Sequence, residues 1–208
     1  MEPLAVEKAI EAIRAGKPVL LPADGVYGLC ASPFDEAAIR GLYELKGRGQ
    51  GQPTAIIAAS LETLFETIPE LDDRARATAR ALLPGPFTLV LPNPARRLAW
   101  LNGARPETMG VRVADVPAVT QRVLDVVGAL AATSANDPGE PPAASLDGVP
   151  ARIRRGSGAE LDAGRLSGRA STVIDFTGPE PVVLREGAGP VAAALLCVQQ
   201  ALAGRPSP

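Results

Sequence analysis

Two pairs of polar residues, Lys46 with Arg48 and Ser134 with Asn136, have the types and the i, i+2 spacing that could direct polar groups at a single ligand. Lys46 and Arg48 lie in the segment 45–53 (LKGRGQGQP), whose glycines disfavour a continued helix. In an extended chain residues i and i+2 point to the same side, so we expect both cations to be aimed at one spot. The alternative is an ordinary solvated helix C-terminus, where Lys and Arg interact favourably with the negative end of the helix dipole.

Ser134 and Asn136 repeat this spacing at the end of a small-residue strand predicted over 129–133 (ALAAT). Ligands of open α/β sheets bind beyond the carboxyl ends of the strands. If the strand direction persists, both side chains face one way. The alternative is the start of a loop, because Ser, Asn and the Asp-Pro-Gly that follows all form turns.

Thr108 and Arg112 form a third candidate group, around the start of the predicted strand 110–114 (GVRVA). An arginine in a buried strand must find an anion or carry a large desolvation cost. That anion is either a ligand or a nearby carboxylate such as Asp115, since strand edges often carry charges.

Ser171 and Arg185 open and close the last predicted strand pair. Arg185 follows the apolar run PVVL and therefore emerges where its strand ends. A surface ion pair with Glu186 or Glu180 is the alternative for Arg185, and the Ser171 hydroxyl could equally cap a turn.

Several site types are excluded by residues that the sequence lacks. It contains no histidine, which removes Ser-His-Asp triads, Cys-His dyads and histidine zinc sites. Neither G-x-G-x-x-G after a strand nor G-x-x-x-x-G-K-[ST] occurs. The net charge of −2 argues against a general nucleic-acid binder. We expect Cys30 and Cys197 to be buried free thiols, and the protein to be cytoplasmic without a signal peptide or membrane span.

The elements that must position these residues alternate between helix and strand. Helices are expected at 4–15, 36–46, after Ser60, at 72–83, 117–127 and 188–203, with 96–103 irregular or a short helix. Strands are expected at 18–22, 26–30, 54–59, 87–92, 110–114, 129–133, 171–176 and 181–186, while 137–170 should hold loops with one or two short elements. We predict a single α/β domain over 1–208, with a core of about 4–203 and a frayed tail at 204–208. Its sheet should be twisted and mixed parallel/antiparallel, flanked by helices.

Seven blocks in order resemble the YrdC-type threonylcarbamoyl-AMP synthase family: LLPADGVYGL, ELKGRGQGQP, LLPGPFTLVLP, TMGVRVADVP, LAATSANDPGEP, STVIDF and VVLREGA. The resemblance runs from about Gly16 to about Gly189. It implies the YrdC-like fold and a nucleotidyltransferase that joins ATP, bicarbonate and L-threonine, releasing pyrophosphate. ATP would bring Mg²⁺ with it, and no metal would be held by the protein alone. The product would serve the t6A modification of tRNA, with tRNA or the t6A-transferase machinery as possible partners.

The resemblance also implies roles for individual residues. Lys46, Arg48, Ser134 and Asn136 match the family's Lys-x-Arg and Ser-x-Asn and would be catalytic. The nucleotide would be bound by Arg48, Gln52, Thr108, Asn136, Ala144 and Arg185. The amino-acid substrate would be bound by Gly25, Tyr27, Arg112, Ser134 and Ser171.

The sequence departs from the family pattern at the amino-acid end. Ala23 and Gly25 replace two threonines of P-T-x-T-V-Y-G-L, Ile57 stands near a histidine of some members, and Glu186 replaces the proline of R-P-G. One alternative is therefore a related carbamoyl-adenylate-forming enzyme that uses another amine. A second alternative is a non-catalytic module that binds RNA through a local basic groove, although stacking aromatics are scarce.

Overall fold

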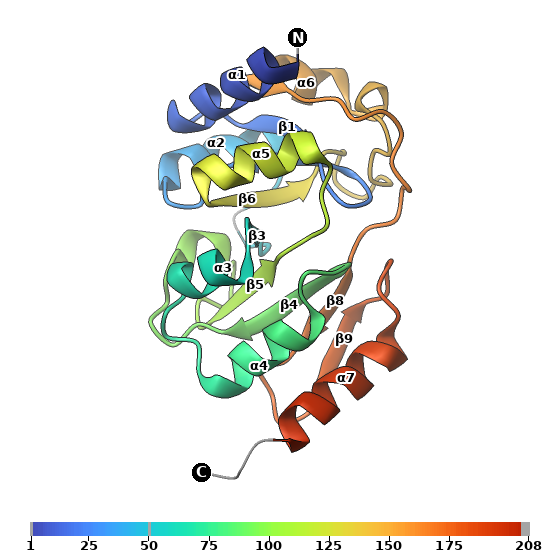
Figure 1. The fold of residues 1–208 in the computed structure, drawn as a ribbon. Helices are drawn as coiled ribbons and strands as arrows, with labels where there is room; N and C mark the ends of the chain where they lie inside the picture. The colour runs from blue at the N-terminus through green and yellow to red at the C-terminus, as the bar shows by residue number, and fades with distance from the viewer. Residues whose placement is uncertain (1, 50, 205–208) are drawn as a thin grey trace.

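The computed structural model describes residues 2–49 and 51–204, which form a mixed nine-stranded sheet flanked by helices (Figure 1). The strands are β1 (Val19–Pro22), β2 (Tyr27–Ala31), β3 (Ala55–Ala58), β4 (Phe87–Pro92), β5 (Thr108–Arg112), β6 (Ala129–Ser134), β7 (Ala159–Glu160), β8 (Thr172–Asp175) and β9 (Val182–Arg185). The helices are α1 (Glu2–Arg14), α2 (Glu36–Lys46), α3 (Leu61–Thr67), α4 (Asp73–Leu82), α5 (Ala118–Val127), α6 (Ala151–Gly156) and α7 (Val191–Ala203), with 3-10 turns η1 (Ala99–Leu101) and η2 (Leu146–Gly148). The expected α/β class is confirmed.

Strand pairing is mostly antiparallel, as the short strand-to-strand links require. The order across the sheet is β7-β1-β2-β6-β3-β5-β4-β8-β9. Only β1 with β7, β3 with β5 and β4 with β8 run parallel among the described strands. This order places β6, β3 and β5 side by side at the centre of the sheet, so three of the four expected polar segments meet there.

Local signals set the helix ends close to the expected positions. The Asp35 carboxylate accepts hydrogen bonds from the backbone N–H groups of Ala37 and Ala38, which caps α2. Gly47 ends the same helix in the left-handed conformation, with φ of 67°, which glycine adopts without steric cost. Helix α7 begins at Val191 rather than 188, because Pro190 occupies its N-cap position.

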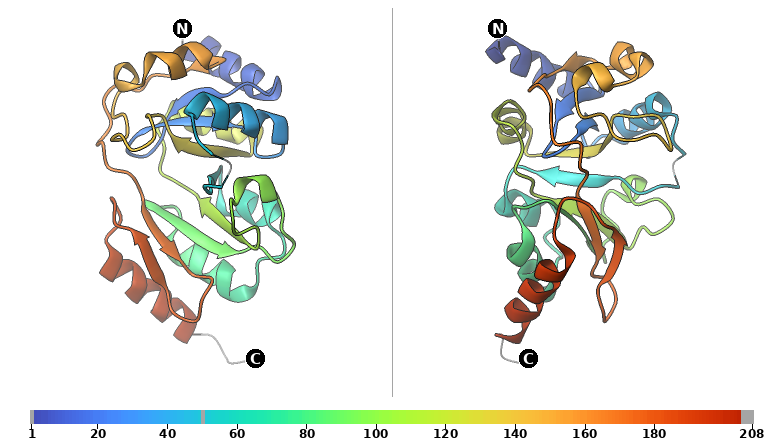
Figure 2. Two further views of the ribbon diagram at one scale, coloured as in Figure 1. Left: turned by 180° about the vertical axis from the view of Figure 1, so that it is seen from behind. Right: turned by 90° about the vertical axis from the view of Figure 1, so that its right-hand side faces the viewer.

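Two apolar clusters hold the sheet between its helices. α1 and α5 pack side by side on one face of the β1–β2–β6 part of the sheet (Figure 1). α2 and α6 cover the opposite face of that part, seen from behind in Figure 2, and α4 packs against α7 beside β4 and β8. Leu20, Leu29, Ile56 and Leu89 are fully buried in the larger cluster. Each such side chain stabilises the fold by about 1.5–3 kcal/mol relative to leaving it exposed.

Two expectations are corrected by the structure, and a third falls partly on residues that it does not describe. Cys197 on α7 is exposed, whereas Cys30 on β2 is buried; both are free thiols. The region 137–170 holds three short elements, η2, α6 and β7, rather than one or two. Residues 205–208 of the tail expected to fray lie outside the described residues. Within 2–49 and 51–204, no helix has both the length and the apolar character that crossing a bilayer requires.

Candidate active site

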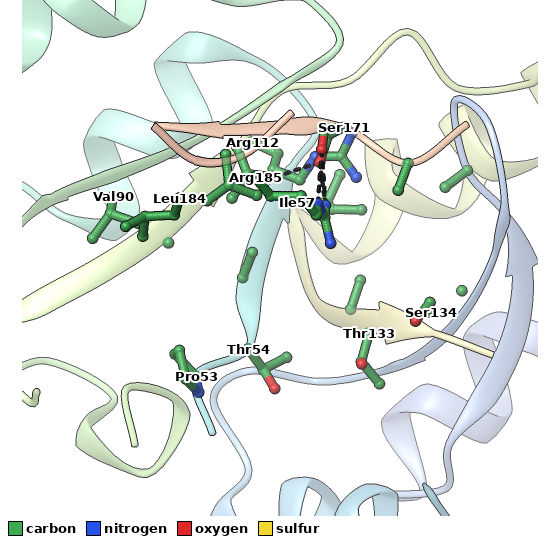
Figure 3. Close-up of a pocket in the computed structure, with 18 of the residues that line it drawn as sticks. Pro53, Thr54, Ile57, Val90, Arg112, Thr133, Ser134, Ser171, Leu184 and Arg185 are labelled. Atoms are coloured by element: carbon green, nitrogen blue, oxygen red, sulfur yellow. Dashed lines mark hydrogen bonds between the residues drawn. The ribbon is translucent and has the colours of Figure 1, made fainter. Parts of the chain in front are cut away.

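A cleft of about 490 Å³ lies over the central strands of the sheet (Figure 3). The strand register explains why it is open. Gly28 pairs with Ser134, Ala55 with Ala132, and Gly110 with Val90, so these side chains share one face. Most of them are glycine, alanine or serine, and α1 and α5 cover only the neighbouring part of that face. The small residues leave a floor that a ligand can occupy, and the volume is typical of small-molecule sites.

The cleft is strongly positive although the chain as a whole is slightly acidic. Among the described residues its lining holds one carboxylate, that of Asp24, and four arginines: Arg48, Arg105, Arg112 and Arg185. With walls of low dielectric constant this charge attracts anions and disfavours cations. Guanidinium groups also match phosphate and carboxylate geometry with two parallel hydrogen bonds. The cleft is therefore suited to a ligand that carries several negative charges.

Arg112 and Arg185 gather with Ser171 at one end of the cleft, as Figure 3 shows. Arg112 donates from Nη2 to Oδ2 of Asp24 at 2.6 Å and from Nε to the Phe87 carbonyl at 3.3 Å. Arg185 donates to the Ser171 carbonyl at 3.1 and 2.9 Å and to its hydroxyl at 3.2 Å. Burial, and then repulsion from Arg112, lowers the pKa of the Arg185 guanidinium. An anion between the two arginines would relieve that repulsion.

A β-bulge brings Arg185 into this position. Val173 pairs with Arg185, but the next residue along β8, Ile174, pairs with Val183, so Leu184 is the extra residue. Both Leu184 and Arg185 line the cleft as a result. Bulges of this kind re-aim side chains beside functional sites.

Arg48 lies on another wall of the cleft. Its Nη1 donates to the Thr133 hydroxyl at 2.9 Å and its Nη2 to the Pro53 carbonyl at 2.5 Å. Its Nε is buried and has no hydrogen-bond partner within the part of the chain that the structure describes. An unsatisfied buried donor costs free energy, which an acceptor supplied by a ligand would recover. Burial lowers the pKa of the Arg48 guanidinium.

Lys46 lies beside the cleft rather than in its lining, and it is 4% exposed. Its ammonium donates to the Ser134 carbonyl at 2.6 Å, to the Asn136 side-chain oxygen at 2.7 Å and to the Asn136 carbonyl. These three acceptors match the three N–H donors of an ammonium group. Burial, and then repulsion from Arg48, lowers the pKa of Lys46 to about 8.

Lys46 and Arg48 do converge on the end of β6, but not through an extended segment. Lys46 is the last residue of α2, and the left-handed Gly47 turns the chain between the two cations. Similarly, Ser134 is the last residue of β6 and lines the cleft, whereas Asn136 lies beyond the turn on Lys46. The expectation that Lys46 and Arg48 meet at one spot was right, although the backbone that brings them there is not extended. The expectation that the side chains of Ser134 and Asn136 face one way was wrong, because only that of Ser134 lines the cleft.

The structure brings six of the predicted site residues together in the cleft lining. These are Arg48, Thr108, Arg112, Ser134, Ser171 and Arg185. The Thr108 hydroxyl donates to the Arg105 carbonyl at 3.0 Å, and the Ser171 hydroxyl shares a hydrogen bond of 2.7 Å with that of Thr88.

Four other predicted residues do not line the cleft. Gln52 is exposed, and the backbone of Ala144 accepts a hydrogen bond from Leu166. Tyr27 is fully buried, and its hydroxyl bonds Asp162 and the Gly164 carbonyl, at 2.6 and 2.8 Å.

Gly25 is the fourth of these, and the segment 167–169 packs directly against it. An added Cβ at Gly25 would lie 2.0 Å from the Arg169 carbonyl oxygen. No side chain fits there in this structure, which is a physical reason for the glycine at a position where the family pattern has threonine.

Sequence reasoning missed Asp24, Arg105 and Thr88. The partner of Arg112 is Asp24, not Asp115, and it lies 88 positions away in the chain. Arg105 lines the cleft mouth and pairs with Asp175 at 2.7 Å. The only sequence signal for Asp24 was its place in the turn after a buried strand. A cluster of three or more His, Cys, Asp or Glu side chains that could hold a metal ion does not occur among residues 2–49 and 51–204.

Comparison with known proteins shows which family the chain belongs to. The profile of the Sua5/YciO/YrdC family, described as telomere recombination, matches residues 11–187. The chain belongs to this family. It is 36% identical over 190 residues to a protein of Mycobacterium leprae, covering 91% of this chain and 84% of that protein. It is also 36% identical over 169 residues to the threonylcarbamoyl-AMP synthase of Halorhodospira halophila, covering 80% and 86%.

Two solved structures share the fold. Escherichia coli YciO superposes with a TM-score of 0.81 at 25% identity, over 94% of each chain. Pyrococcus abyssi Sua5 in complex with L-threonine superposes with a TM-score of 0.80 at 32% identity. That match covers 92% of this chain and 56% of Sua5. The match with YciO therefore extends over nearly the whole length of both chains, whereas the match with Sua5 covers a little over half of Sua5.

Proposed function

We propose that this protein is an L-threonylcarbamoyladenylate synthase. It forms threonylcarbamoyl-AMP and pyrophosphate from ATP, bicarbonate and L-threonine, and the product serves the t6A modification of tRNA. The observation that carries this proposal is the cleft itself, which sets four arginines against one carboxylate. Two relatives at about 35% identity, for which the match covers most of the relative's own length, are named threonylcarbamoyl-AMP synthase. Sua5, which has the corresponding fold, binds L-threonine.

The proposed reaction has two steps. The ammonium group of threonine first loses a proton to solvent; the neutral amine then attacks bicarbonate, and water leaves to give a carbamate. A carbamate oxygen then attacks the α-phosphorus of ATP, and pyrophosphate leaves with the electron pair of the broken P–O bond. Negative charge builds up on phosphate oxygens in the second step, where preorganised cations stabilise it most.

The arginines divide these tasks between the two ends of the cleft. Arg48 and Arg105 would hold the polyphosphate, since the unpaired Nε of Arg48 needs an acceptor. Arg112 with Ser171 would bind the amino-acid substrate, with Arg112 on its carboxylate, and Arg185 would bind the reacting phosphate. Thr108 and Ser134 supply hydroxyls to the same space. Mg²⁺ would enter with ATP as part of the substrate, where it would neutralise phosphate charge.

Lys46 would act through the loop that it holds. Its ammonium fixes the Ser134 and Asn136 carbonyls, and so orients the Ser134 hydroxyl at the cleft. Asn136 takes part from behind the cleft lining. No histidine base is required, because holding the reactants in place and stabilising charge lower most of the barrier. Four predicted residues do not line the cleft, and in this proposal they contact substrates only after the segments that carry them rearrange. They are Gln52, Ala144, Gly25 and Tyr27.

The test is a pyrophosphate-release assay with ATP, Mg²⁺ and bicarbonate, with and without L-threonine. We expect release to depend on threonine, and to fall about a hundredfold in Arg48→Ala, because losing one charged contact typically costs about 2–4 kcal/mol. Near wild-type rates in that variant would overturn the site assignment.

One observation favours a second candidate, a related enzyme that uses another amine. Ala23 and Ile57 line the cleft beside Arg112 where the family pattern has groups able to form hydrogen bonds. Comparing turnover across amino acids decides between the two, and equal rates without threonine would favour the second. An RNA-binding module would instead show RNA affinity that falls steeply with salt and no response to ATP.

A further inference from the structure

We propose that Asp24 binds the amino group of the amino-acid substrate and thereby makes the cleft selective for a zwitterion over a simple carboxylic acid. This inference rests on the proposed function, because it assigns a residue to the amino-acid end of the same cleft. It adds a recognition element that neither the motifs nor the comparisons assign.

The first argument is the charge of the cleft lining. Asp24 is its only carboxylate among the described residues, beside four arginines. A cleft that served only phosphates and carboxylates would be weakened by an acid in its wall, since like charges repel at short range in a poorly solvated site. A substrate with a cationic or N–H-donating group gives that acid a partner.

The second argument is position. The Asp24 carboxylate contacts the Arg112 guanidinium at 2.6 Å, and the two side chains are 12% and 11% exposed. Arg112 in turn lies beside Arg185 and Ser171 at the same end (Figure 3). An α-amino acid carries its amino and carboxylate groups on one carbon. A ligand placed with its carboxylate on Arg112 therefore has its amino group within reach of Asp24.

The third argument is what Asp24 lacks. Among residues 2–49 and 51–204 its carboxylate accepts one side-chain hydrogen bond, from Arg112 Nη2, although an ionised carboxylate has about four acceptor sites. The residues beside it in the cleft wall, Ala23, Val26 and Ile57, have no polar side-chain atoms. Asp24 thus has acceptor capacity facing the cleft, which an amino group can use while the pair with Arg112 stays in place.

A purely structural role is the competing explanation, in which Asp24 only orients Arg112. The two roles differ for a ligand without an amino group. If Asp24 binds the amino group, removing the charge of Asp24 lowers the affinity for L-threonine. The affinity for 3-hydroxybutanoate then stays the same or rises, because Arg112 loses a competing anion. If Asp24 only orients Arg112, both ligands weaken by the same factor.

The experiment is calorimetric titration of the full chain with L-threonine and with 3-hydroxybutanoate, in the presence of a non-hydrolysable ATP analogue. We expect Asp24→Asn to raise the Kd for L-threonine about tenfold or more. The Kd for 3-hydroxybutanoate should change less than about twofold, or fall. Asp24→Glu should restore part of the threonine affinity. Glu70→Gln is the matched control, because Glu70 pairs with Arg97 on the surface outside the cleft.

Equal weakening of both ligands, or unchanged threonine affinity in Asp24→Asn, would overturn the assignment of Asp24. Thermal unfolding of each variant shows whether it is folded, and Asp24→Ser serves as a second variant if Asp24→Asn is not. Failure of the wild-type chain to bind threonine at all would instead overturn the proposed function. The two failures are therefore distinguishable.

Discussion

Lys46 offers the sharpest test of how the site is built, because its ammonium joins α2 to the loop after β6. Substitution by Met keeps most of the stem and removes the three donors. The acceptors are the carbonyls of Ser134 and Asn136 and the side-chain oxygen of Asn136. A buried acceptor left without a donor costs about 1–3 kcal/mol. Taking the lower value for each, the loss is about 3 kcal/mol, which corresponds to roughly a hundredfold in an equilibrium or rate constant.

The same contacts predict how activity depends on pH. The lysine must be protonated to supply all three donors, and its pKa is lowered to about 8. About nine tenths of the protein then carries the ammonium at pH 7, and about one tenth at pH 9. We expect kcat/KM to fall about tenfold per pH unit above 8. The charged groups that set this pKa besides burial are Arg48, Arg152 and Asp137.

The assay is pyrophosphate release between pH 6.5 and 9.5, for the wild type, Lys46→Met and Lys46→Arg. We expect Lys46→Met to lower kcat/KM about a hundredfold at pH 7. In this variant kcat/KM should not fall further as the pH rises above 8. Lys46→Arg, which stays protonated, should have lower activity than the wild type and no fall near pH 8. Lys8→Met and Lys17→Met are matched controls, since these are the other two lysines and both are exposed. A flat wild-type profile to pH 9.5, or Lys46→Met with more than half of wild-type activity, would refute this reasoning.

Three further predictions concern other contacts. Gly25→Thr should lower the free energy of unfolding by about 2–4 kcal/mol in urea titrations, because its Cβ meets the Arg169 carbonyl oxygen; a loss under 0.5 kcal/mol would contradict this packing. Gly110→Leu, on the cleft floor, should raise the Kd for ATP more than about tenfold in calorimetry while the fold is retained; unchanged ATP affinity would place the nucleotide elsewhere. Burial alone would raise the pKa of Asp175, but hydrogen bonds from Thr177 and Arg105 lower this pKa below its usual value overall. The stability that this gives is present above pH about 4 and is lost as the pH falls through the pKa that Asp175 has in the folded protein. The free energy of unfolding of Asp175→Asn should therefore depend less on pH in this acidic range.

Much of the fold could be read from the sequence because its signals are local. The periodicity of Ile39 and Leu42, the Asp35 cap and the glycine after Lys46 are sufficient to place α2 within a residue. The cleft residues Arg112 and Arg185 were also found, because a charge inside or at the end of an apolar strand is costly without a partner. What such reasoning could not supply was the partner itself.

The sequence by itself determined which residue types could act on a polyphosphate, the alternation of helices and strands, and the exclusion of histidine chemistry. Only the tertiary structure decided which of those residues share a cleft. It paired Arg112 with Asp24 across 88 positions, turned Lys46 away from the ligand space onto β6, and aimed Arg185 inward through a bulge. The physical reason is that strand register and chain turns fix the direction of each side chain. Both depend on hydrogen bonds between segments far apart in the chain, which no local pattern encodes.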